Sequence, residues 1–500
     1  MFAWLGKGLS ALGNRIAGPA QPSAAYRAAV KSIIQARYDS AQNTQENSRR
    51  WVGVDLYSAR AANSFNVRRQ LRIRSRYCRD NNSFFRGIVR NKTNHLFMGT
   101  GPTPKVKGPD VTGNKRIEAG WKAWWKAVGG LKKLKVMAQA KLVDGEGFFV
   151  LQTNKRVNHS VQLYPHDIEA DQVTTPQPLN LDESFTDGII LDEFSNPLYY
   201  TILKSHPGDF LFPNLNPLDS RKVRADYVIQ WFQKDRPGQV RGIPEMTAAL
   251  ELFEQMRTFR MATLTAAEAA ALLSVVLESV APADPAAYTP SPMQAINFER
   301  GQMLETPGGY KASQLTAEHP NTTYEVFVYC LLAEACRCIG VPLNVALGTS
   351  QKFNFSSARL DHMDYRDGLV IDRQDCNEVV MDRLFRAYTE EAVMIPGLLP
   401  DGATPETIEV DWHWPGWAYL DPQKDALADT ERLTKNRTMT YEQFFAEQGK
   451  DWEEQFEQFA AEREKLEELG LDPLDAAPAK PGFGGDSSEE EGADAQAQAA

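Results

Sequence analysis

The stretch Gln239–Val280, QVRGIPEMTAALELFEQMRTFRMATLTAAEAAALLSVVLESV, decides the fold. Pro244 and Glu245 suit the first turn of a helix, because proline lacks the N–H that this turn leaves unpaired and a carboxylate favours the positive end of the dipole. Apolar residues then recur every three or four positions, at Met246, Leu250, Phe253, Met256 and Phe259. The pattern predicts one helix of about 37 residues, roughly 55 Å long.

The second half of this stretch, Ala262–Leu273, carries small residues on every side. Three interpretations are open: a core helix of a large domain, a membrane span, or a helix packed against copies of itself in a ring. Arg260, Glu268 and Glu278 argue against a membrane span, because they bracket or interrupt an apolar run that is already too short. The stretch by itself does not separate the other two.

The amino-acid composition is typical of a soluble globular protein. The 500 residues are 42% hydrophobic and 24% charged, which suggests about two to four domains. Residues 1–18 lack the basic region and apolar core of a secretory signal, and five cysteines, an odd number, argue against a disulfide framework. We therefore expect a soluble protein that is made in a reducing compartment.

Charge is distributed unevenly along the chain. Residues 1–100 hold 17 Lys and Arg against 4 Asp and Glu, whereas residues 401–500 hold 8 against 25. Such a polarity suits an anionic partner at one end. It equally suits neutralisation of one end by the other, within a subunit or between subunits.

A stripe of arginines lies in the basic part of the chain. Helical spacing places on one face the residues Arg68, Arg72, Arg76 and Arg79. Such a stripe can be a phosphate footprint of a nucleic-acid-binding protein. The acidic half of the chain favours the other interpretation, in which these arginines form salt bridges at an interface between subunits.

Residues 113–232 predict a core helix followed by a sheet. Trp121, Trp124 and Trp125 are typical of the buried face of an amphipathic helix. The sequence Asp144–Gly147, DGEG, indicates a turn that enters a strand, since no companion ligands support a metal site there. Short β-rich runs then follow, FFVLQ, VQLYP, DGIILDE, NPLYYTIL and DYVIQWF. The fold class is therefore α+β.

A second apolar helix is predicted at Thr323–Ile339, suited to return antiparallel to the first. Zinc would need its thiolates on one face, and spacings of six and two on a helix do not converge, so we expect buried thiols at Cys330, Cys336 and Cys338. A polar, flexible loop follows at residues 343–357, then a third helix at about residues 358–391.

The last part of the chain is acidic. Residues 408–416 alternate as a strand does, and residues 417–469 predict two helical segments with Trp452, Phe456 and Phe459 on one face. Residues 472–500 are Pro, Gly, Ser, Glu and Ala with almost no large apolar side chain, so we expect them to be disordered.

Motifs of catalysis are missing from the sequence. It contains no G-x-x-x-x-G-K-[ST] loop, no H-E-x-x-H and no G-x-S-x-G, and its seven histidines include no pair at metal-ligand spacing. We therefore predict no catalytic residues, no cofactor and no metal.

Five stretches, in order, resemble the portal proteins of tailed bacteriophages of the lambda type. They are RIRSRYCRDNNSFFRGIVRNKTNHLFMGTG (72–101), DGEGFFVL (144–151), RPGQVRGIPEMTAALELFEQMRTFRMATLTAAEAAAL (236–272), CRCIGVPLNVALGTSQKFNFSSARLDHMDYRD (336–367), and WHWPGWAYLDPQKDALADTERL (412–433) leading to GKDWEEQFEQFAAEREKLEELGL (449–471). The resemblance covers roughly residues 30–471.

This resemblance implies a portal-protein fold, and it divides the chain into nine parts. They are an N-terminal arm (1–25), a wing of helices and β-rich segments (26–240), a stem helix (241–280), a clip (281–319), a second stem helix (320–340), a channel loop (341–357), a long helix with a return to the wing (358–416), a helical crown (417–471) and a disordered acidic tail (472–500).

The resemblance also implies a function. The chain would form a homo-oligomeric ring, a dodecamer, at one capsid vertex of the virion, after assembly in the host cytoplasm. Double-stranded DNA would pass through it without sequence preference. The protein partners would be the terminase large subunit, head-completion and tail-joining proteins, and capsid or scaffold protein; no membrane is involved.

Tentative site residues follow from these positions. Lys352, read as the one unpaired cation of the channel loop, and nearby Arg359 would make weak, transient contacts with DNA. Neighbouring stems would meet through the small residues Ala262, Ala266, Ala269 and Ala270.

Two other functions stay open on the sequence. A DNA-processing enzyme of the packaging apparatus would hydrolyse ATP or cleave DNA when purified. A non-viral, membrane-associated oligomer would be found in membrane fractions that need detergent.

Overall fold

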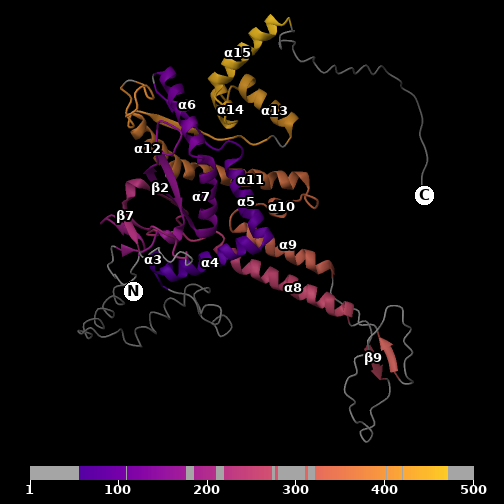
Figure 1. Ribbon diagram of the computed structural model, residues 1–500. Helices are drawn as coiled ribbons and strands as arrows, with labels where there is room; N and C mark the ends of the chain where they lie inside the picture. The colour runs from indigo at the N-terminus through magenta and orange to yellow at the C-terminus, as the bar shows by residue number, and fades with distance from the viewer. Residues whose placement is uncertain are drawn as a thin grey trace, which may run out of the picture. The chain divides into compact units, whose positions relative to one another are not determined.

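The computed structural model describes residues 56–470, except for 109, 176–184, 210–218, 273–275, 280–309, 314–320, 401 and 419–420 (Figure 1). The chain divides into two compact units between Ala61 and Ala62, and the short helix α3 (Ala59–Ala62) spans this division. All that follows concerns the second unit, which mixes helices and strands. The predicted arm (1–25) and tail (472–500) lie outside the described residues, as does the predicted clip (281–319) except for residues 310–313.

Four helices open the second unit: α4 (Phe65–Asn81), α5 (Ser83–Phe97), α6 (Val111–Ala127) and α7 (Gly130–Asp144). A single residue, Asn82, separates α4 from α5. Its extended backbone ends the first helix, and its side chain accepts hydrogen bonds from the N–H groups of Phe84 and Phe85 at 3.1 and 3.2 Å. This is an N-cap, as the polar cluster at residues 80–83 predicts.

Two antiparallel sheets follow the helices. The first has the order β3–β2–β8, with β2 (Glu146–Thr153) in the centre between β3 (Leu163–Ile168) and β8 (Val228–Phe232). The second has the order β4 (Phe185–Thr186), β5 (Ile189–Leu191), β6 (Pro197–Leu203) and β7 (Ser220–Arg224). The predicted strands are confirmed. Strand β7 was not predicted, because three of the five residues in its sequence, SRKVR, are charged.

Two further pairs of strands join distant parts of the chain. Strand β1 (Thr103–Lys107) pairs antiparallel with β11 (Glu409–His413), which confirms the predicted strand at 408–416. Strand β9 (Val276–Ser279) pairs antiparallel with β10 (Tyr310–Ser313).

The predicted tryptophans form an aromatic core. Trp121 and Trp124 are buried on α6, with ring centroids 4.8 Å apart. The ring of Trp121 lies 5.3 Å from those of Phe385 and Tyr388 on α12 (Asp382–Ala392). The indole N–H of Trp124 donates to the carbonyl of Leu163 on β3 at 2.9 Å. This cluster therefore fastens α6, α12 and the sheet to one another.

The structure corrects the predicted long helix at both ends. Helix α8 runs from Leu250 to Leu272 after a 3-10 turn at Thr247–Ala249, and Val276–Ser279 forms strand β9 instead of continuing it. Residues before the turn are held by other partners. The N–H of Gly242 donates to the Glu146 carboxylate at 3.1 Å, and that of Glu245 to the Leu142 carbonyl at 3.2 Å. The 23 residues of α8 span about 35 Å.

The second apolar helix, α9 (Asn321–Arg337), returns antiparallel along α8, as predicted (Figure 1). Phe259 in the middle of α8 stacks on Tyr324 near the start of α9, with centroids 5.6 Å apart. Cys338, just beyond α9, donates to the carbonyl of Glu245, just before α8, at 3.0 Å. The start of α9 thus lies beside the middle of α8, and the end of α9 lies beside the residues before α8, which fixes the antiparallel direction.

The segment after α9 is more helical than predicted. Residues 343–347 of the expected loop form the short helix α10 (Leu343–Leu347), because Pro342 and Gly348 supply its two ends. A nearly continuous helix then follows, made of α11 (Phe355–Cys376), a π-helical turn (Asn377–Met381) and α12. This confirms the third predicted helix.

The acidic region forms more helices than the two expected. These are α13 (Pro422–Thr430), which continues in a π-helical turn (Glu431–Lys435), α14 (Tyr441–Glu447) and α15 (Trp452–Glu468). Trp452, Phe456 and Phe459 share one face, as predicted, with successive ring centroids 6.0 and 6.4 Å apart. None of the helices in the described ranges combines the length and the apolar character that a membrane crossing requires.

Trp121→Ala should lower the free energy of unfolding by about 3–5 kcal/mol, because it leaves a large cavity between α6 and α12. Urea denaturation followed by circular dichroism measures the loss. Trp452→Ala is the control, since this tryptophan is partly exposed on α15. Equal losses in the two variants would contradict the assignment of Trp121 to the core.

Candidate functional site

Among the described residues, the carboxylate of Glu146, at the start of β2, is a buried polar group with many partners. Its side chain has no solvent exposure. Arg241 places Nη2 2.6 Å from Oε1 and Nε 2.9 and 3.0 Å from the two oxygens, and Arg72 binds Oε1 from the other side. The side-chain amide of Gln230 donates to Oε2 at 2.8 Å, in addition to the N–H of Gly242. Both oxygens are therefore fully paired.

The predicted arginine stripe converges on this carboxylate and its neighbours. Arg68 reaches Asp187 at 2.5 Å, and Arg72 reaches Asp171 at 3.2 Å as well as Glu146. The structure therefore confirms that arginines of the stripe share one face of α4.

Two more arginines complete the stripe. Arg76 contacts Asp144 and Asp171, both at 2.6 Å. Arg79 is exposed and pairs with Asp80, the next residue, at 2.9 Å. The partners of all four arginines belong to the same chain, and Arg68 and Arg72 lie in its interior. A role of the stripe between subunits stays a prediction.

Burial and charge compete at these groups. Burial alone raises the pKa of Glu146, but the positive charges of Arg241 and Arg72 outweigh it and lower this pKa to about 2. Burial, together with the charge of Arg241, lowers the pKa of Arg68 to about 10. Glu146 is consequently ionised at neutral pH.

Sequence patterns missed Glu146 and Arg241. The DGEG motif does form the predicted turn, with Gly145 at φ +90° after α7. The same turn also places the carboxylate of Glu146 in the interior of the protein. One signal was present: a single acidic residue begins an otherwise apolar buried strand, in a chain that has an arginine stripe upstream.

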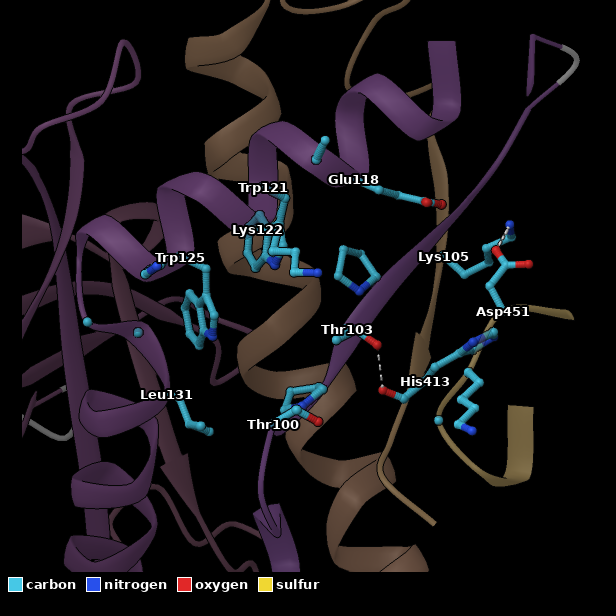
Figure 2. A pocket seen from close by; sticks show the side chains of 18 of the residues that line it. Thr100, Thr103, Lys105, Glu118, Trp121, Lys122, Trp125, Leu131, His413 and Asp451 are labelled. Carbon is cyan, nitrogen blue, oxygen red and sulfur yellow. Dashed lines mark hydrogen bonds and ion pairs between the residues drawn. The ribbon is translucent and has the colours of Figure 1, made fainter. Parts of the chain in front are cut away.

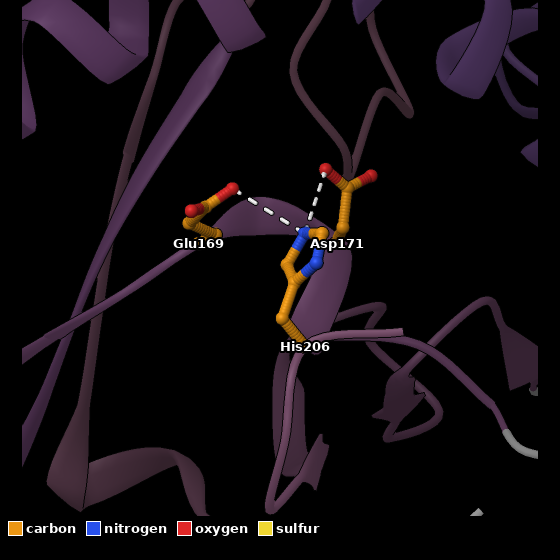
Figure 3. Close-up of side chains that lie close together, drawn as sticks. All are labelled: Glu169, Asp171 and His206. Carbon is orange, nitrogen blue, oxygen red and sulfur yellow. Dashed lines mark ion pairs between the residues drawn. The ribbon is translucent and has the colours of Figure 1, made fainter. Parts of the chain in front are cut away.

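A second cluster, Glu169, Asp171 and His206, has the composition of a metal site (Figure 3). Its ligand atoms lie within 4.8 Å of one another. Arg76, however, already binds Glu169 at 3.3 Å and Asp171 at 2.6 Å, so a guanidinium supplies the positive charge. Nδ1 of His206 accepts the N–H of Gly208, which directs Nε2 toward the carboxylates as a donor. The cluster is therefore an extension of the ion-pair network.

The two residues predicted to contact DNA have separate partners. Lys352 pairs with Glu325 on α9 and lies 5.4 Å from the ring of Tyr329, so the prediction that it is unpaired is wrong. The sequence did not reveal this partner because it lies 27 residues away on another helix. Arg359 on α11 binds Asp425 on α13 at 3.0 Å. Contact of either residue with DNA stays a prediction.

The predicted contacts of the long helix are only partly described. Ala262 is exposed and Ala266 is half-buried, while the side chains of Ala269 and Ala270 lie outside the described residues. Met261 and Leu264 beside them are large, apolar and exposed. This surface is available to another molecule, and its role between subunits stays a prediction.

The cysteines correct another prediction. Cys336 is buried, and burial raises its pKa to about 12, but Cys330 and Cys338 are exposed. The expectation of three buried thiols is wrong for these two, because Cys330 lies on a face of α9 turned from the core and Cys338 lies beyond the end of the helix.

A large basic hollow of about 1100 Å³ lies between α6, the start of α7 and β1 (Figure 2). Trp121 and Trp125 form part of its wall, and lysines form much of its rim. Lys105 pairs with Asp451, and Lys115 pairs with Glu457 at 2.9 Å. These ion pairs connect β1 and α6 to the acidic region, although both lysines lie outside the strongly basic residues 1–100.

Comparison with known proteins gives one family. Residues 45–373 match the family described as "Phage portal protein, lambda family". A curated relative, a "Probable portal protein" of Halomonas phage phiHAP-1, is 24% identical over 296 residues, which is 57% of this chain and 56% of that protein. The alignment thus spans little more than half of the relative's length.

Comparison with solved structures returns chains from a gene transfer agent. One is titled "Neck of empty GTA particle computed with C6 symmetry", with a TM-score of 0.40, 12% identity, and coverage of 79% of this chain and 93% of that one. Another is titled "Neck of native GTA particle computed with C12 symmetry", with a TM-score of 0.34, 14% identity, and coverage of 77% and 99%.

Glu146→Gln should lower the free energy of unfolding by about 3–5 kcal/mol, because it leaves Arg241 and Arg72 without their buried counter-charge. The pH dependence should change too. The pKa of Glu146 falls from 4.5 to about 2 on folding, so its contribution is complete above pH 4.5 and is lost as the pH falls toward 2. Urea midpoints measured between pH 5 and 2.5 should therefore fall less steeply in the variant.

Glu193→Gln is the matched control, since Glu193 is exposed in the turn between β5 and β6. It should retain both the stability and the pH profile of the parent chain. A Glu146→Gln variant with the parental stability would contradict the counter-charge role.

Proposed function

Because the chain belongs to the lambda family of phage portal proteins, we propose that it is the subunit of a ring at one capsid vertex, through which double-stranded DNA enters and leaves the head. The family match, over residues 45–373, is the observation that carries this proposal. The family is structural rather than enzymatic, which agrees with the absence of nucleotide-binding and hydrolase motifs from the sequence.

The antiparallel pair α8–α9 supports a stem. Phe259 of α8 packs against α9, with its ring centroid 4.5 Å from that of Phe327. Outward, the pair exposes the apolar side chains of Met261, Leu264 and Val326. Exposed apolar surface of this kind is typical of an interface between proteins. We assign it, with the alanines of α8, to contacts between neighbouring subunits.

The remaining parts take their roles from this arrangement. The two sheets with α4–α7 form the wing, residues 281–319 form the clip, and α13–α15 form the crown. The clip docks the terminase large subunit during packaging and the head-completion and tail-joining proteins afterwards, and capsid or scaffold protein surrounds the ring. Assembly takes place in the host cytoplasm, and the finished ring is part of the virion.

Lys352 and Arg359 remain the proposed contacts with DNA. The ion pair of Lys352 with Glu325 is exposed, and an exposed pair of this kind is weak enough to exchange its carboxylate for a phosphate. Such contacts are blind to sequence and weaken with salt. They let DNA slide, whereas a strong site would hold it in place.

Native mass spectrometry of the purified chain tests the ring. The expected result is a closed assembly, for a dodecamer about twelve times the 56.0 kDa of one chain, that persists on dilution because its stem contacts are apolar. Replacement of both Met261 and Leu264 by Gln should shift the population toward single chains. Equal populations of assembly in the parent and this variant would contradict the assignment of α8 to the interface.

Lys352→Ala combined with Arg359→Ala should alter the rate of DNA packaging and leave ring formation intact. The control is Lys204→Ala combined with Arg386→Ala, because each of these exposed cations also has one carboxylate partner. Packaging measured in extracts that contain terminase and ATP should respond to the first pair only. Loss of rings would show that Lys352 and Arg359 are structural, and unchanged packaging would show that they do not meet DNA.

A further inference from the structure

A second cavity, of about 1010 Å³, lies between α11, the segment Trp412–Ala418 and the helices α13 and α14. One face of α11 forms its wall through residues that recur every three or four positions, Arg359, Met363, Arg366, Val370 and Arg373. Trp414, Trp417 and Phe444 add aromatic surface. The cavity therefore combines guanidinium groups and aromatic surface with three carboxylates, those of Asp425, Asp429 and Glu447.

Arg373 is the unusual member of this wall. Its side chain is buried, with the residue 6% exposed. Nε donates to the carbonyl of Leu96 at 3.0 Å, and the guanidinium lies over the rings of Trp417 and Trp414 at 4.3 and 5.1 Å. Its buried Nη2 atom has no hydrogen-bond partner within the described part of the chain. Burial, with no compensating charge, lowers its pKa to about 10.

Other buried arginines of this chain are paired differently. Arg72 and Arg241 share the carboxylate of Glu146, so their charges are compensated inside the protein. No carboxylate of the described segments forms an ion pair with Arg373. A buried charge without a partner is costly, and stacking on two indoles offsets only part of that cost. Arg373 therefore offers a buried positive charge that an anion in the cavity would compensate.

Arg366 strengthens this conclusion. It lies two helical turns from Arg373 on the same face, and its Nη2 donates to the carbonyl of Ala418 at 3.1 Å. Burial lowers its pKa as well, although Asp425 counteracts this in part. Carboxylates pair with Lys105 and Lys115 in the lysine-rimmed hollow beside α6, and Asp425 pairs with Arg359 here, so the distinguishing feature of this cavity is Arg373, which has no such partner among the described residues. The Arg373 cavity is thus the better anion site of the two.

The sequence contains a suitable anion. Residues 486–491, DSSEEE, hold four carboxylates in six residues and follow Phe483, which matches a cavity of arginines and aromatic rings. These residues lie outside the described part. Gln448 and Lys450, which line the cavity, immediately precede α15, whose 17 residues span about 25 Å. Fully extended, 16 residues, the number from Gly470 to Asp486, reach at most about 54 Å, more than the length of α15. The acidic segment can therefore return to the cavity of its own chain.

We propose that the acidic segment 486–491 docks in this cavity and places a carboxylate on the guanidinium groups of Arg373 and Arg366. The docked segment neutralises the buried charge of Arg373. The proposal does not depend on the function proposed above.

A double-mutant cycle in the full-length chain tests it. One variant neutralises the segment by Asp486→Asn, Glu489→Gln, Glu490→Gln and Glu491→Gln; the other is Arg373→Met, which removes the buried charge and keeps an apolar side chain of similar length. Neutralisation should lower the urea midpoint of the parent chain and leave that of the Arg373→Met variant unchanged. The same shift in both backgrounds, or no shift in either, would overturn the proposal.

Asp472→Asn with Asp475→Asn is the matched control. These carboxylates follow Gly470 by at most five residues, so even a fully extended chain reaches only about 17 Å, short of the cavity. Inorganic phosphate provides a second control. Phosphate could stabilise the chain only when Arg373 is present, while neutralising the segment leaves the urea midpoint unchanged. That combination would identify a free oxyanion as the ligand and overturn the proposal.

Cross-linking gives an answer even if the Arg373→Met variant does not fold. Cysteines introduced by Ala418→Cys at the cavity and Ser488→Cys in the segment should form a disulfide on mild oxidation, mapped by mass spectrometry to distinguish it from exposed Cys330 and Cys338. Neutralising the four carboxylates should reduce its yield to that of a control pair, Lys222→Cys with Ser488→Cys. Equal yields for both pairs before neutralisation would overturn the proposal.

Discussion

The buried carboxylate of Glu146 is the interaction on which the arrangement of the chain depends. It is held by Arg72 of α4 and by Arg241, which comes just before α8, while Glu146 itself begins β2. Three segments that are far apart in sequence therefore meet at one charge. Through Asp187, Arg68 extends the network to the loop between β4 and β5. No part of this network can move independently without exposing a buried charge to an apolar interior.

The network also explains where α8 begins. The N–H of Gly242 is used by Glu146, and a side chain at Gly242 would collide with the carbonyl of Gly145. Residues 239–245 are consequently held outside a helix, and α8 leaves the body of the protein from a fixed point. An ion network of this kind is not itself a large source of stability; its hypothesised role is to specify one arrangement. The apolar packing of Trp121 and Trp124 against α12 supplies the stabilisation.

Local patterns were sufficient to predict much of the fold. The stripe of α4, the tryptophan face of α6, the β-rich runs and the return of α9 along α8 all depend on periodicity within one element, and the structure confirms them. The ends of α8 could not be predicted in this way, because a carboxylate 96 residues upstream competes for the N–H of Gly242. The partner of Lys352 was missed for the same reason: Glu325 approaches it only after α9 has folded back.

Site residues were harder to predict than elements. The DGEG sequence predicted only a turn at Glu146, whereas the importance of this residue arises from two arginines, Arg72 and Arg241, that no single window of sequence contains together with it. Arg373 resembles any other charged residue on a helix, and only the packing of Trp414 and Trp417 over it reveals a buried cation without an ionic partner among the described residues. Long-range electrostatics, rather than helix or strand propensity, separates the predicted features from the missed ones.

The central claim is that this chain forms the wall of a conduit for DNA. Negative-stain electron microscopy of the purified protein tests it most directly. We expect rings with a central hole wide enough for duplex DNA. Single chains at every concentration, or closed assemblies without such a hole, would contradict it.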